Sequence, residues 1–350
     1  MNRFWLTLCL LACAGCAASG RIAHGDAAAR GAQYLWSQQA NDGGWHSRTY
    51  GLLRSGESLT PFVLDALLQM SDPPAGRVSQ AIDFLRRHTE ASGAVGRSDP
   101  SLEDYPNYAT AYAVQAICRA RPDGWRDIVR PMVAYLRSQQ FVESNGWTRD
   151  HPVYGAWGMG GERRTPPHTG HVDLSMTRTV LQALAAAGVS GDDPAMQKAI
   201  VFLGRCRNSD GGFHFSTVIL DANKAGHDGD GYRSYGTATA DGIVSMLSAG
   251  IDAADPRVRA AADWLLNHHS PEEAPGFVGE AYSRWKQGLR FYYASQSAEG
   301  FSLLKLPTPH YNLEALQRPD GSWINPEKLV KEDDPLIATA FALRALSNRR

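Results

Sequence analysis

Apolar residues recur along this chain at helical spacing, in two kinds of segment that alternate. The first kind has one apolar face and one face rich in Arg, Lys and Gln. Its clearest copy is Arg30 to Trp45, which reads R-G-A-Q-Y-L-W-S-Q-Q-A-N-D-G-G-W. The spacing predicts a short helix that ends at Gln39, followed by a turn over 42–44 that brings the indole of Trp45 back across the helix end. We expect this indole to hold neighbouring helices together.

The same pattern returns five more times, and its third copy has a lengthened turn that closes on Trp147. The copies are Gln80 to Val95, Tyr135 to Trp147, Lys198 to Phe213, Trp264 to Phe277 and Gln317 to Trp323. A pattern that returns in this way indicates a fold built from repeats.

The second kind of segment is rich in Ala and Leu, and several copies are apolar nearly all round, which is typical of helices enclosed by others. These segments are Leu59 to Met70, Tyr108 to Ala120, Val172 to Ala187, Ser234 to Ala249, Gly288 to Leu304 and Pro335 to Leu346. Six outer helices that alternate with six inner ones predict an all-α fold, a closed α/α toroid over residues 24–350. Residues 287–301 also fit the outer pattern, but the alternation assigns them to an inner helix.

The N-terminus has the pattern of a secretory signal over residues 1–19. A basic start at Asn2-Arg3 precedes an apolar run from Phe4 to Ala14, which is too short for a stable membrane span. The run ends in C-A-G-C, which resembles a bacterial lipobox and would make Cys16 a lipidated residue. The alternative is ordinary cleavage near Ala17 or Ala18. We therefore expect an exported protein, periplasmic or anchored to the outer membrane.

Composition narrows the function. Hydrophobic residues make up 43% of the chain, charged residues 20%, and the formal net charge is -1. No basic field attracts nucleic acid. Three of the five cysteines lie in the leader, so Cys118 and Cys206 remain, in different repeats. We expect both to be small buried residues without a disulfide, and we expect no metal and no cofactor.

The repeated pattern resembles the QW motif of squalene-hopene and oxidosqualene cyclases, and the ring resembles that of protein prenyltransferase β subunits. Among them the chain is similar to bacterial exported proteins with prenyltransferase and squalene oxidase repeats, which are single toroids. The resemblance implies one terpenoid-cyclase-like toroid domain.

The catalytic motifs of these families have weak counterparts here. The cyclases protonate an alkene with the middle Asp of an Asp-x-Asp-Asp-Thr-Ala motif, and the nearest stretch is Lys331 to Pro335, K-E-D-D-P. Asp333 and Asp334 are therefore candidate acids, but Asp334 before a proline is also the expected N-cap of a helix. The zinc-binding Asp-x-Cys pair of prenyltransferases corresponds to Asp230-Gly231-Tyr232, which lacks the cysteine, so the resemblance predicts no zinc site.

Two loops ahead of inner helices carry other candidates. The loop from His168 to Asp173 brings His171 near Asp173, which suits an acid and a base or a metal, although Asp173 also fits a helix cap. The loop from Asp221 to Tyr232 is a Gly-rich insertion that is either functional or a surface loop.

Aromatic residues are candidates for the lining of a central cavity. The strongest are Tyr108, Tyr112, Tyr235, Tyr292 and Tyr293, with His171 beside them. Such rings stabilise cations in a cyclase, stack on sugars in a polysaccharide enzyme, or fill the core.

Three functions follow in order of preference. The first is a binding or scaffolding module of the cell envelope, which takes an apolar isoprenoid-like ligand or a protein partner and reaches the membrane through Cys16. The second is a terpene cyclase-like enzyme that uses Asp173, Asp333 or Asp334 as the acid. The third is a polysaccharide-active enzyme, for which Tyr108, His171 and Arg233 are candidates. The character of the cavity wall discriminates among the three.

Overall fold

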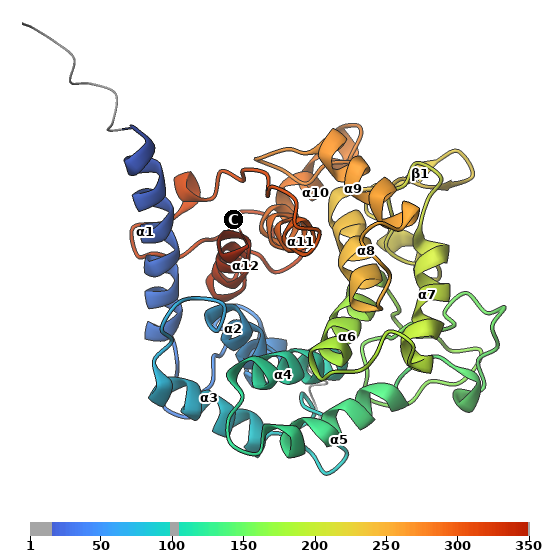
Figure 1. Cartoon of the computed structure of the whole chain (residues 1–350), viewed down its shortest axis with the longest axis horizontal. Helices are drawn as coiled ribbons and strands as arrows, with labels where there is room; N and C mark the ends of the chain where they lie inside the picture. The colour runs from blue at the N-terminus through green and yellow to red at the C-terminus, as the bar shows by residue number, and fades with distance from the viewer. Residues whose placement is uncertain (1–15, 99–104, 349–350) are drawn as a thin grey trace, which may run out of the picture.

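The computed structural model describes residues 16–98 and 105–348. Its helices form two concentric rings (Figure 1). The inner ring consists of α2 (Leu59–Leu67), α4 (Pro106–Ala120), α6 (Leu174–Ala186), α8 (Gly236–Ser248), α11 (Arg290–Leu303) and α12 (Pro335–Ser347). Each inner helix packs against the next, and α12 packs against α2, which closes the ring. The prediction of an all-α toroid is confirmed, and residues 290–303 lie in the inner ring as the alternation requires.

The outer ring covers the inner one with amphipathic helices. These are α1 (Cys16–Ser37), α3 (Ala75–Arg87), α5 (Trp125–Ser138), α7 (Pro194–Cys206) and α9 (Pro256–His268). The sixth outer place differs from the predicted helix, because it holds a loop with the single 3-10 turn η5 (Glu314–Leu316). Pro307 and Pro309 precede this turn, and proline removes the backbone donors that a helix needs.

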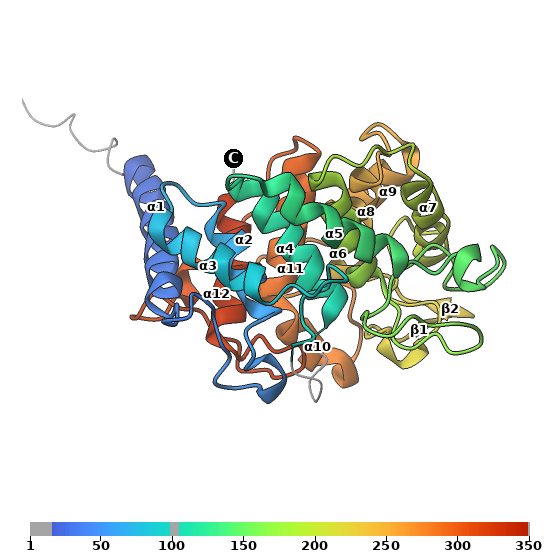
Figure 2. The ribbon, with the colours of Figure 1, turned by 90° about the horizontal axis from the view of Figure 1, so that it is seen from below.

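The short elements lie along one end of the ring. They include η1 (Gly51–Leu53), η2 (Glu143–Asn145), η3 (Leu220–Ala222), the hairpin of β1 (His227–Asp228) and β2 (Gly231–Tyr232), η4 (Glu280–Tyr282) and α10 (Ser283–Gly288). Figure 2 shows the hairpin and α10 at the end opposite the C-terminus, where the inner helices begin. We call this the mouth end.

Buried indoles join the outer and inner rings as the repeat predicts. Trp45 Nε1 donates a hydrogen bond of 2.7 Å to the carbonyl of Leu35 in α1. Its backbone N–H donates to Thr60 Oγ1 in α2 at 2.9 Å. The same two bonds recur at Trp157 and at Trp323.

In the third repeat the closing indole is Trp157, and the prediction of Trp147 was wrong. Trp147 is buried too, but its Nε1 donates to the carbonyl of Arg164 in the loop that follows. The turn is longer than the spacing suggested because η2 and residues 146–154 are inserted before it. Gly155 then takes the turn geometry that Gly43 has in the first repeat, with φ +86 and an ideal Cβ position only 2.0 Å from the carbonyl oxygen of Lys198.

The glutamine of the repeat, present in the first, third and last copies, joins its outer segment to the next. Gln39 Nε2 donates to the carbonyl of Arg77, in the first turn of α3, at 3.0 Å. In the last repeat, Gln317 Nε2 donates to the carbonyl of Ala27 in α1 at 2.8 Å. The first and last repeats are therefore joined by the same bond that joins neighbouring ones, and the outer ring closes there.

The predicted leader falls almost wholly on residues 1–15, which lie outside the described residues, and the lipidation of Cys16 stays a prediction. Across residues 16–98 and 105–348, no helix is both long enough and apolar enough to cross a bilayer. Cys118 and Cys206 are buried free thiols.

Candidate functional site

A cavity of about 490 Å³ lies on the axis of the inner ring, at the mouth end. Its wall includes residues of all six inner helices: Leu59, Phe62, Tyr108, Tyr112, Ser175, Arg178, Thr237, Tyr292, Ile337 and Phe341. The mouth loops add further residues: Leu53, Tyr105, Met159, His171, Asp173, Phe215, Asp221, Ala222, Lys224, Tyr235, Trp285, Leu289, Leu329, Val330 and Lys331. A volume of this size is typical of sites for small organic ligands.

Four rings form a continuous aromatic belt around the cavity, made of Tyr112, Phe62, Phe341 and Tyr292. Their centroids are 5.1 Å apart from Tyr112 to Phe62, 5.0 Å from Phe62 to Phe341 and 5.2 Å from Phe341 to Tyr292. Tyr108 lies nearly parallel to Tyr112 one helical turn away. The belt crosses α4, α2, α12 and α11, so it presents ring faces and edges to whatever fills the axis.

The floor of the cavity is a buried ion pair. Arg178 Nε in α6 lies 2.9 Å from Asp241 Oδ1 in α8, and both side chains are almost fully buried. Tyr292 donates to the other oxygen of Asp241 at 2.6 Å. Burial raises the pKa of Asp241 to about 6, although Arg178 and the Tyr292 hydroxyl favour the anion. The pairing keeps the floor close to neutral overall.

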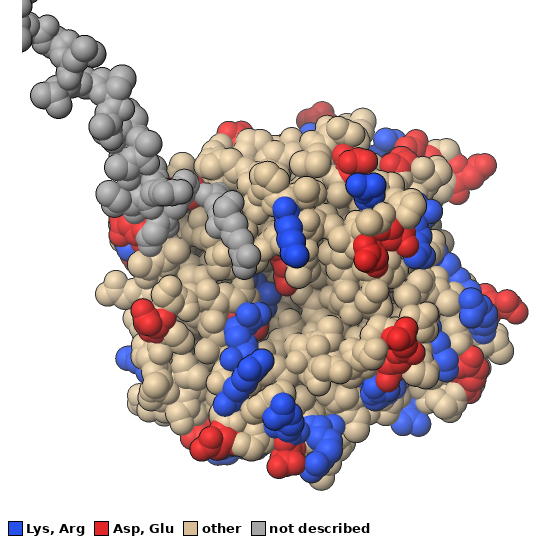
Figure 3. Space-filling model, in the orientation of Figure 1, with Lys and Arg blue, Asp and Glu red and all other residues tan. Residues whose placement is uncertain are grey.

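A second buried ion cluster lies beyond the floor. Asp65 pairs with Arg344 and with Arg119, whose Nε is 3.1 Å from Asp65 Oδ1. These residues stand in the last turns of α2, α12 and α4. Figure 3 shows the face at which these helices end, where Lys and Arg side chains form a row beside a hollow. Asp65 and Arg344 are buried, whereas Arg119 is half-exposed on that face. The lining residues outside the inner helices belong to the mouth loops, with Asp221 exposed among them, so the cavity opens at the mouth end.

Asp173 is a buried carboxylate of the cavity wall. Its Oδ1 accepts bonds from Met176 N at 2.7 Å and Ser175 Oγ at 2.9 Å, so it caps α6. Its Oδ2 lies 2.8 Å from Nε2 of His171. Burial alone would raise the pKa of Asp173, but the hydrogen bonds from His171, Met176 and Ser175 outweigh it and hold the pKa below its usual value.

Hydrogen bonds connect Asp173 both to the mouth and to the aromatic wall of the cavity. His171 is half-exposed at the mouth, and Ser175 Oγ lies 2.7 Å from the hydroxyl of Tyr108, which faces the cavity. Burial raises the pKa of the Tyr108 phenol well above its usual value, with the Asp173 charge adding to the effect. The chain from His171 through Asp173 and Ser175 to Tyr108 therefore links the mouth to the aromatic wall by hydrogen bonds.

The acidic run before α12 lies outside the cavity lining. Asp334 accepts from Leu336 N at 2.9 Å and from Ser47, so it caps the helix. Asp333 accepts from the hydroxyl of Tyr50. Glu332 accepts from the backbone N–H groups of Phe291 and Tyr292 at 3.1 Å and 2.7 Å, at the start of α11. Asp334 and Glu332 therefore hold the starts of α12 and α11, and Asp333 joins the run to Tyr50.

Most of the aromatic residues predicted to line the cavity do so, and one faces away from it. Tyr108, Tyr112, Tyr235, Tyr292 and His171 line the cavity. Tyr293 does not, which corrects its prediction: it packs against Tyr311 and His269 on the other side of α11. Successive helix residues point about 100° apart, so Tyr292 and Tyr293 face different neighbours.

Two lysines that the sequence analysis did not single out also line the cavity. Lys224 Nζ lies 3.6 Å from the centroid of the Phe215 ring and 5.6 Å from that of Trp285. Lys331 Nζ lies 5.5 Å from the centroid of the Tyr105 ring. Lys224 belongs to the Gly-rich insertion. The length of this insertion was the sequence feature that indicated a functional loop here.

The remaining sequence candidates lie apart from the cavity. His227, Asp228 and Asp230 of the insertion form or adjoin the β1–β2 hairpin, and Arg233 pairs with Asp228 at 3.5 Å. The lining therefore does not bring Arg233 to Tyr108 and His171. Within the described residues, no three His, Cys, Asp or Glu side chains gather as metal ligands.

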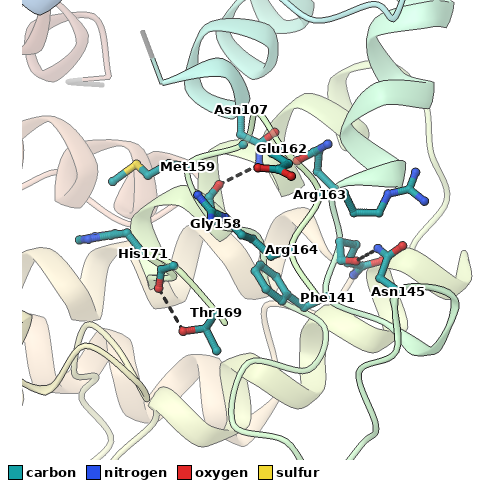
Figure 4. Close-up of a pocket in the computed structure, with 14 residues that line it drawn as sticks. Asn107, Phe141, Asn145, Gly158, Met159, Glu162, Arg163, Arg164, Thr169 and His171 are labelled. Carbon is teal, nitrogen blue, oxygen red and sulfur yellow. Dashed lines mark hydrogen bonds between the residues drawn. The ribbon is translucent and has the colours of Figure 1, made fainter. Parts of the chain in front are cut away.

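A small polar pocket adjoins the cavity (Figure 4). Its volume is about 40 Å³, and it shares Met159 and His171 with the cavity lining. Asn107 Nδ2 donates across it to the carbonyl of Gly158 at 2.7 Å. A pocket of this volume has room for roughly three water molecules, so an organic ligand fits the central cavity and not this pocket.

Comparison with known proteins agrees with the fold. No protein-family model matches the sequence. The chain is 24% identical over 286 residues to a probable squalene-hopene cyclase from Sinorhizobium fredii, covering 78% of this chain and 35% of that one. It is 28% identical over 168 residues to a squalene-hopene cyclase from Bradyrhizobium diazoefficiens, covering 46% and 22%. The chain thus spans about a third or less of the length of these relatives.

Solved structures share the ring. A type II terpene cyclase from Scytonema, in complex with merosterolic acid A, has a TM-score of 0.59 at 15% identity, covering 93% of this chain and 97% of that one. A Candida albicans protein geranylgeranyltransferase-I complexed with GGPP has a TM-score of 0.50 at 15% identity, covering 83% of both. The chain is a terpenoid cyclase/prenyltransferase-like α/α toroid.

Proposed function

We propose that this protein is a terpene-cyclase-like binding module of the cell envelope that holds an isoprenoid chain in its central cavity. The observation that carries the proposal is the cavity itself, about 490 Å³ in volume and belted by Tyr112, Phe62, Phe341 and Tyr292. A scaffold without a ligand would need no such space, because side chains fill a core to crystal-like density.

The chemistry of the wall suits a branched polyene. Burial of apolar surface contributes about 25 cal/mol per Å², and a chain against the belt is shielded from water on all sides except the mouth. Ring faces also attract the electron-poor hydrogens of neighbouring groups. A Scytonema type II terpene cyclase with 14% identity and a TM-score of 0.55 was solved with geranylgeranyl dihydroxybenzoate as its substrate, which supports a ligand of this kind.

The proposed compartment rests on the leader sequence. Acylation of Cys16 would attach the protein to a membrane, where apolar chains are stored. Metabolic labelling with a fatty acid tests this step. The wild-type chain should carry the label and Cys16→Ala should not, and an unlabelled wild-type chain would remove the anchor from the proposal.

The binding proposal is tested by blocking the cavity. Ala222 lines it from η3 and is half-buried, so Ala222→Trp places an indole in the space. Ala29→Trp makes the same change on the exposed face of α1. In calorimetric titrations, geranylgeraniol should bind the wild-type protein and Ala29→Trp alike and bind Ala222→Trp at least tenfold more weakly. Equal affinity for all three proteins contradicts binding in the cavity.

A second candidate function is acid-initiated cyclisation, which the position of Asp173 favours. It is a buried carboxylate of the wall, and in its neutral form it would add a proton to one carbon of an alkene. The π electrons form the new C–H bond and leave a tertiary cation. The π electrons of a second alkene of the same chain then attack this cation, which closes a ring by a new C–C bond and leaves a new cation. Loss of a proton from a carbon next to the new cation to water ends the reaction. Because His171 holds the pKa of Asp173 low, turnover should increase as the pH falls.

Product analysis distinguishes cyclisation from binding. Geranylgeraniol is incubated with the wild-type protein, with Asp173→Asn and with Asp221→Asn, which alters an exposed carboxylate at the rim of the same cavity. Cyclic product from the wild type and Asp221→Asn, but not from Asp173→Asn, supports the enzyme. Absence of cyclic product from the wild type at every pH leaves binding as the function.

A further inference from the structure

The charges that line the cavity are unevenly compensated. His171 lies against Asp173, and Arg178 pairs with Asp241. Two ammonium groups remain, on Lys224 and Lys331, against the exposed carboxylate of Asp221 at the rim. Among the described residues, neither lysine has a carboxylate oxygen within 4.0 Å.

Lys224 is held over aromatic rings without an ionic partner among the described side chains. Its Nζ lies over the Phe215 ring at 3.6 Å and donates to the carbonyl of Ala222 at 3.2 Å. An ammonium has three donors, so this bond leaves others for a ligand. Burial lowers the pKa of Lys224 to about 8, although the charges of Asp173 and Asp241 favour protonation.

Lys331 repeats the arrangement from another mouth loop. Its Nζ lies 5.5 Å from the ring centroids of both Tyr50 and Tyr105, and it donates to the Tyr105 hydroxyl at 3.3 Å. Cation–π contacts offset part of the desolvation of an ammonium. They do not neutralise the charge of this half-buried lysine, so its ammonium can still pair with an anion.

We propose that the ligand is an amphipathic isoprenoid whose anionic head, a carboxylate or a phosphate, pairs with Lys224 and Lys331 while its chain lies along the aromatic belt. This inference rests on the proposed function and sets its ligand class apart from squalene, the hydrocarbon in the names of the sequence relatives. Charge-assisted hydrogen bonds to the head would use the free ammonium donors of Lys224.

The test compares three probes that share one chain: geranylgeranoic acid, geranylgeranyl monophosphate and geranylgeraniol, titrated calorimetrically at pH 7. At least one anion should bind the wild-type protein tenfold or more tightly than the alcohol does, and the preferred anion identifies the head. Lys224→Met should lose that preference and bind the alcohol within about twofold of the wild type. Lys331→Met should lose a smaller part of it.

Two further variants make the result specific. Lys224→Arg restores a cation and should recover the preference for the anion. Lys198→Met removes a partly exposed lysine from the outer ring, where it pairs with Glu143, and should leave the affinities for all three probes unchanged. Thermal unfolding by circular dichroism confirms that each variant is folded.

The outcomes separate this inference from the binding proposal. If the alcohol binds as tightly as both anions, the anionic head is wrong while binding in the cavity stands. If Lys224→Met weakens all three probes equally, the lysine packs against the chain and does not recognise a head. If no probe binds, both proposals are overturned.

Discussion

Arg178 in α6 and Asp241 in α8 meet at 2.9 Å on the floor of the cavity, and Tyr292 of α11 donates to the same carboxylate. Three inner helices are therefore joined where the cavity ends. Removing one partner of a buried pair leaves the other charge uncompensated, which is far more destabilising than replacing both.

The floor pair gives the first prediction. Arg178→Met should lower the free energy of unfolding by about 3–5 kcal/mol, because Asp241 then loses its buried counterion. The double variant Arg178→Met with Asp241→Asn should recover part of that loss. Urea unfolding followed by tryptophan fluorescence measures both. A loss below about 1 kcal/mol in the single variant would show that the pair does not hold the floor.

The second prediction concerns Gly155, the turn glycine of the third repeat. Gly155→Ala forces a Cβ to within 2.0 Å of the Lys198 carbonyl at a φ of +86, so we expect a loss of about 1–3 kcal/mol or more from strain at this backbone conformation. Gly204→Ala is the matched change, since Gly204 is exposed in α7 with open space around its Cβ position. It should stabilise the helix by up to about 1 kcal/mol.

The same urea titrations, made on the two glycine variants side by side, decide whether the turn is required. Opposite signs for Gly155→Ala and Gly204→Ala agree with a tight turn packed on the next outer helix. Similar small effects would mean that the turn relaxes without loss.

The third prediction is that Glu332 makes the stability of the fold depend on pH. Burial raises the pKa of Glu332 from 4.5 to about 7, against the hydrogen bonds from Asn325, Tyr292 and Phe291 that favour the anion. Between these values the folded carboxyl keeps its proton while the unfolded one has lost it, so stability falls as the pH rises from about 5 to 7.

Glu332→Gln should flatten that slope by up to one proton, about 1.4 kcal/mol per pH unit. The change of stability with pH is the readout, because the substitution also removes an acceptor for the α11 N-terminus and so shifts the absolute stability. Free energies of unfolding measured at pH 5, 6 and 7 give this slope. Parallel slopes for the variant and the wild type would assign the pH dependence to other groups, such as Asp241, whose pKa burial also raises.

The fold was predictable because the same residue types make the same contacts in several copies of the repeat. In the first and last copies the closing indole follows the carbonyl that accepts its hydrogen bond by 10 residues, as Trp45 follows Leu35 and Trp323 follows Leu313. Where an insertion changed that distance, the prediction failed: Trp147 precedes the turn that Trp157 closes.

The site was less predictable because it is assembled by ring closure. Arg178 and Asp241 are far apart in sequence. A single charged residue in an apolar helix pattern does not indicate which residue it pairs with. Phe62 and Phe341 come from repeats at opposite ends of the chain and touch only because α2 and α12 are neighbours. Among the aromatics, spacing alone did not separate Tyr292 from Tyr293.

The central claim is that the ring holds an isoprenoid, and the most direct measurement is native mass spectrometry with lipid extraction. The 350-residue chain is expressed in an isoprenoid-producing bacterial host, beside Ala222→Trp and Ala29→Trp. We predict a bound polyprenyl molecule on the wild type and on Ala29→Trp that is lost from Ala222→Trp. A protein that purifies empty, and stays empty when mixed with geranylgeraniol, geranylgeranoic acid or squalene, would contradict the account.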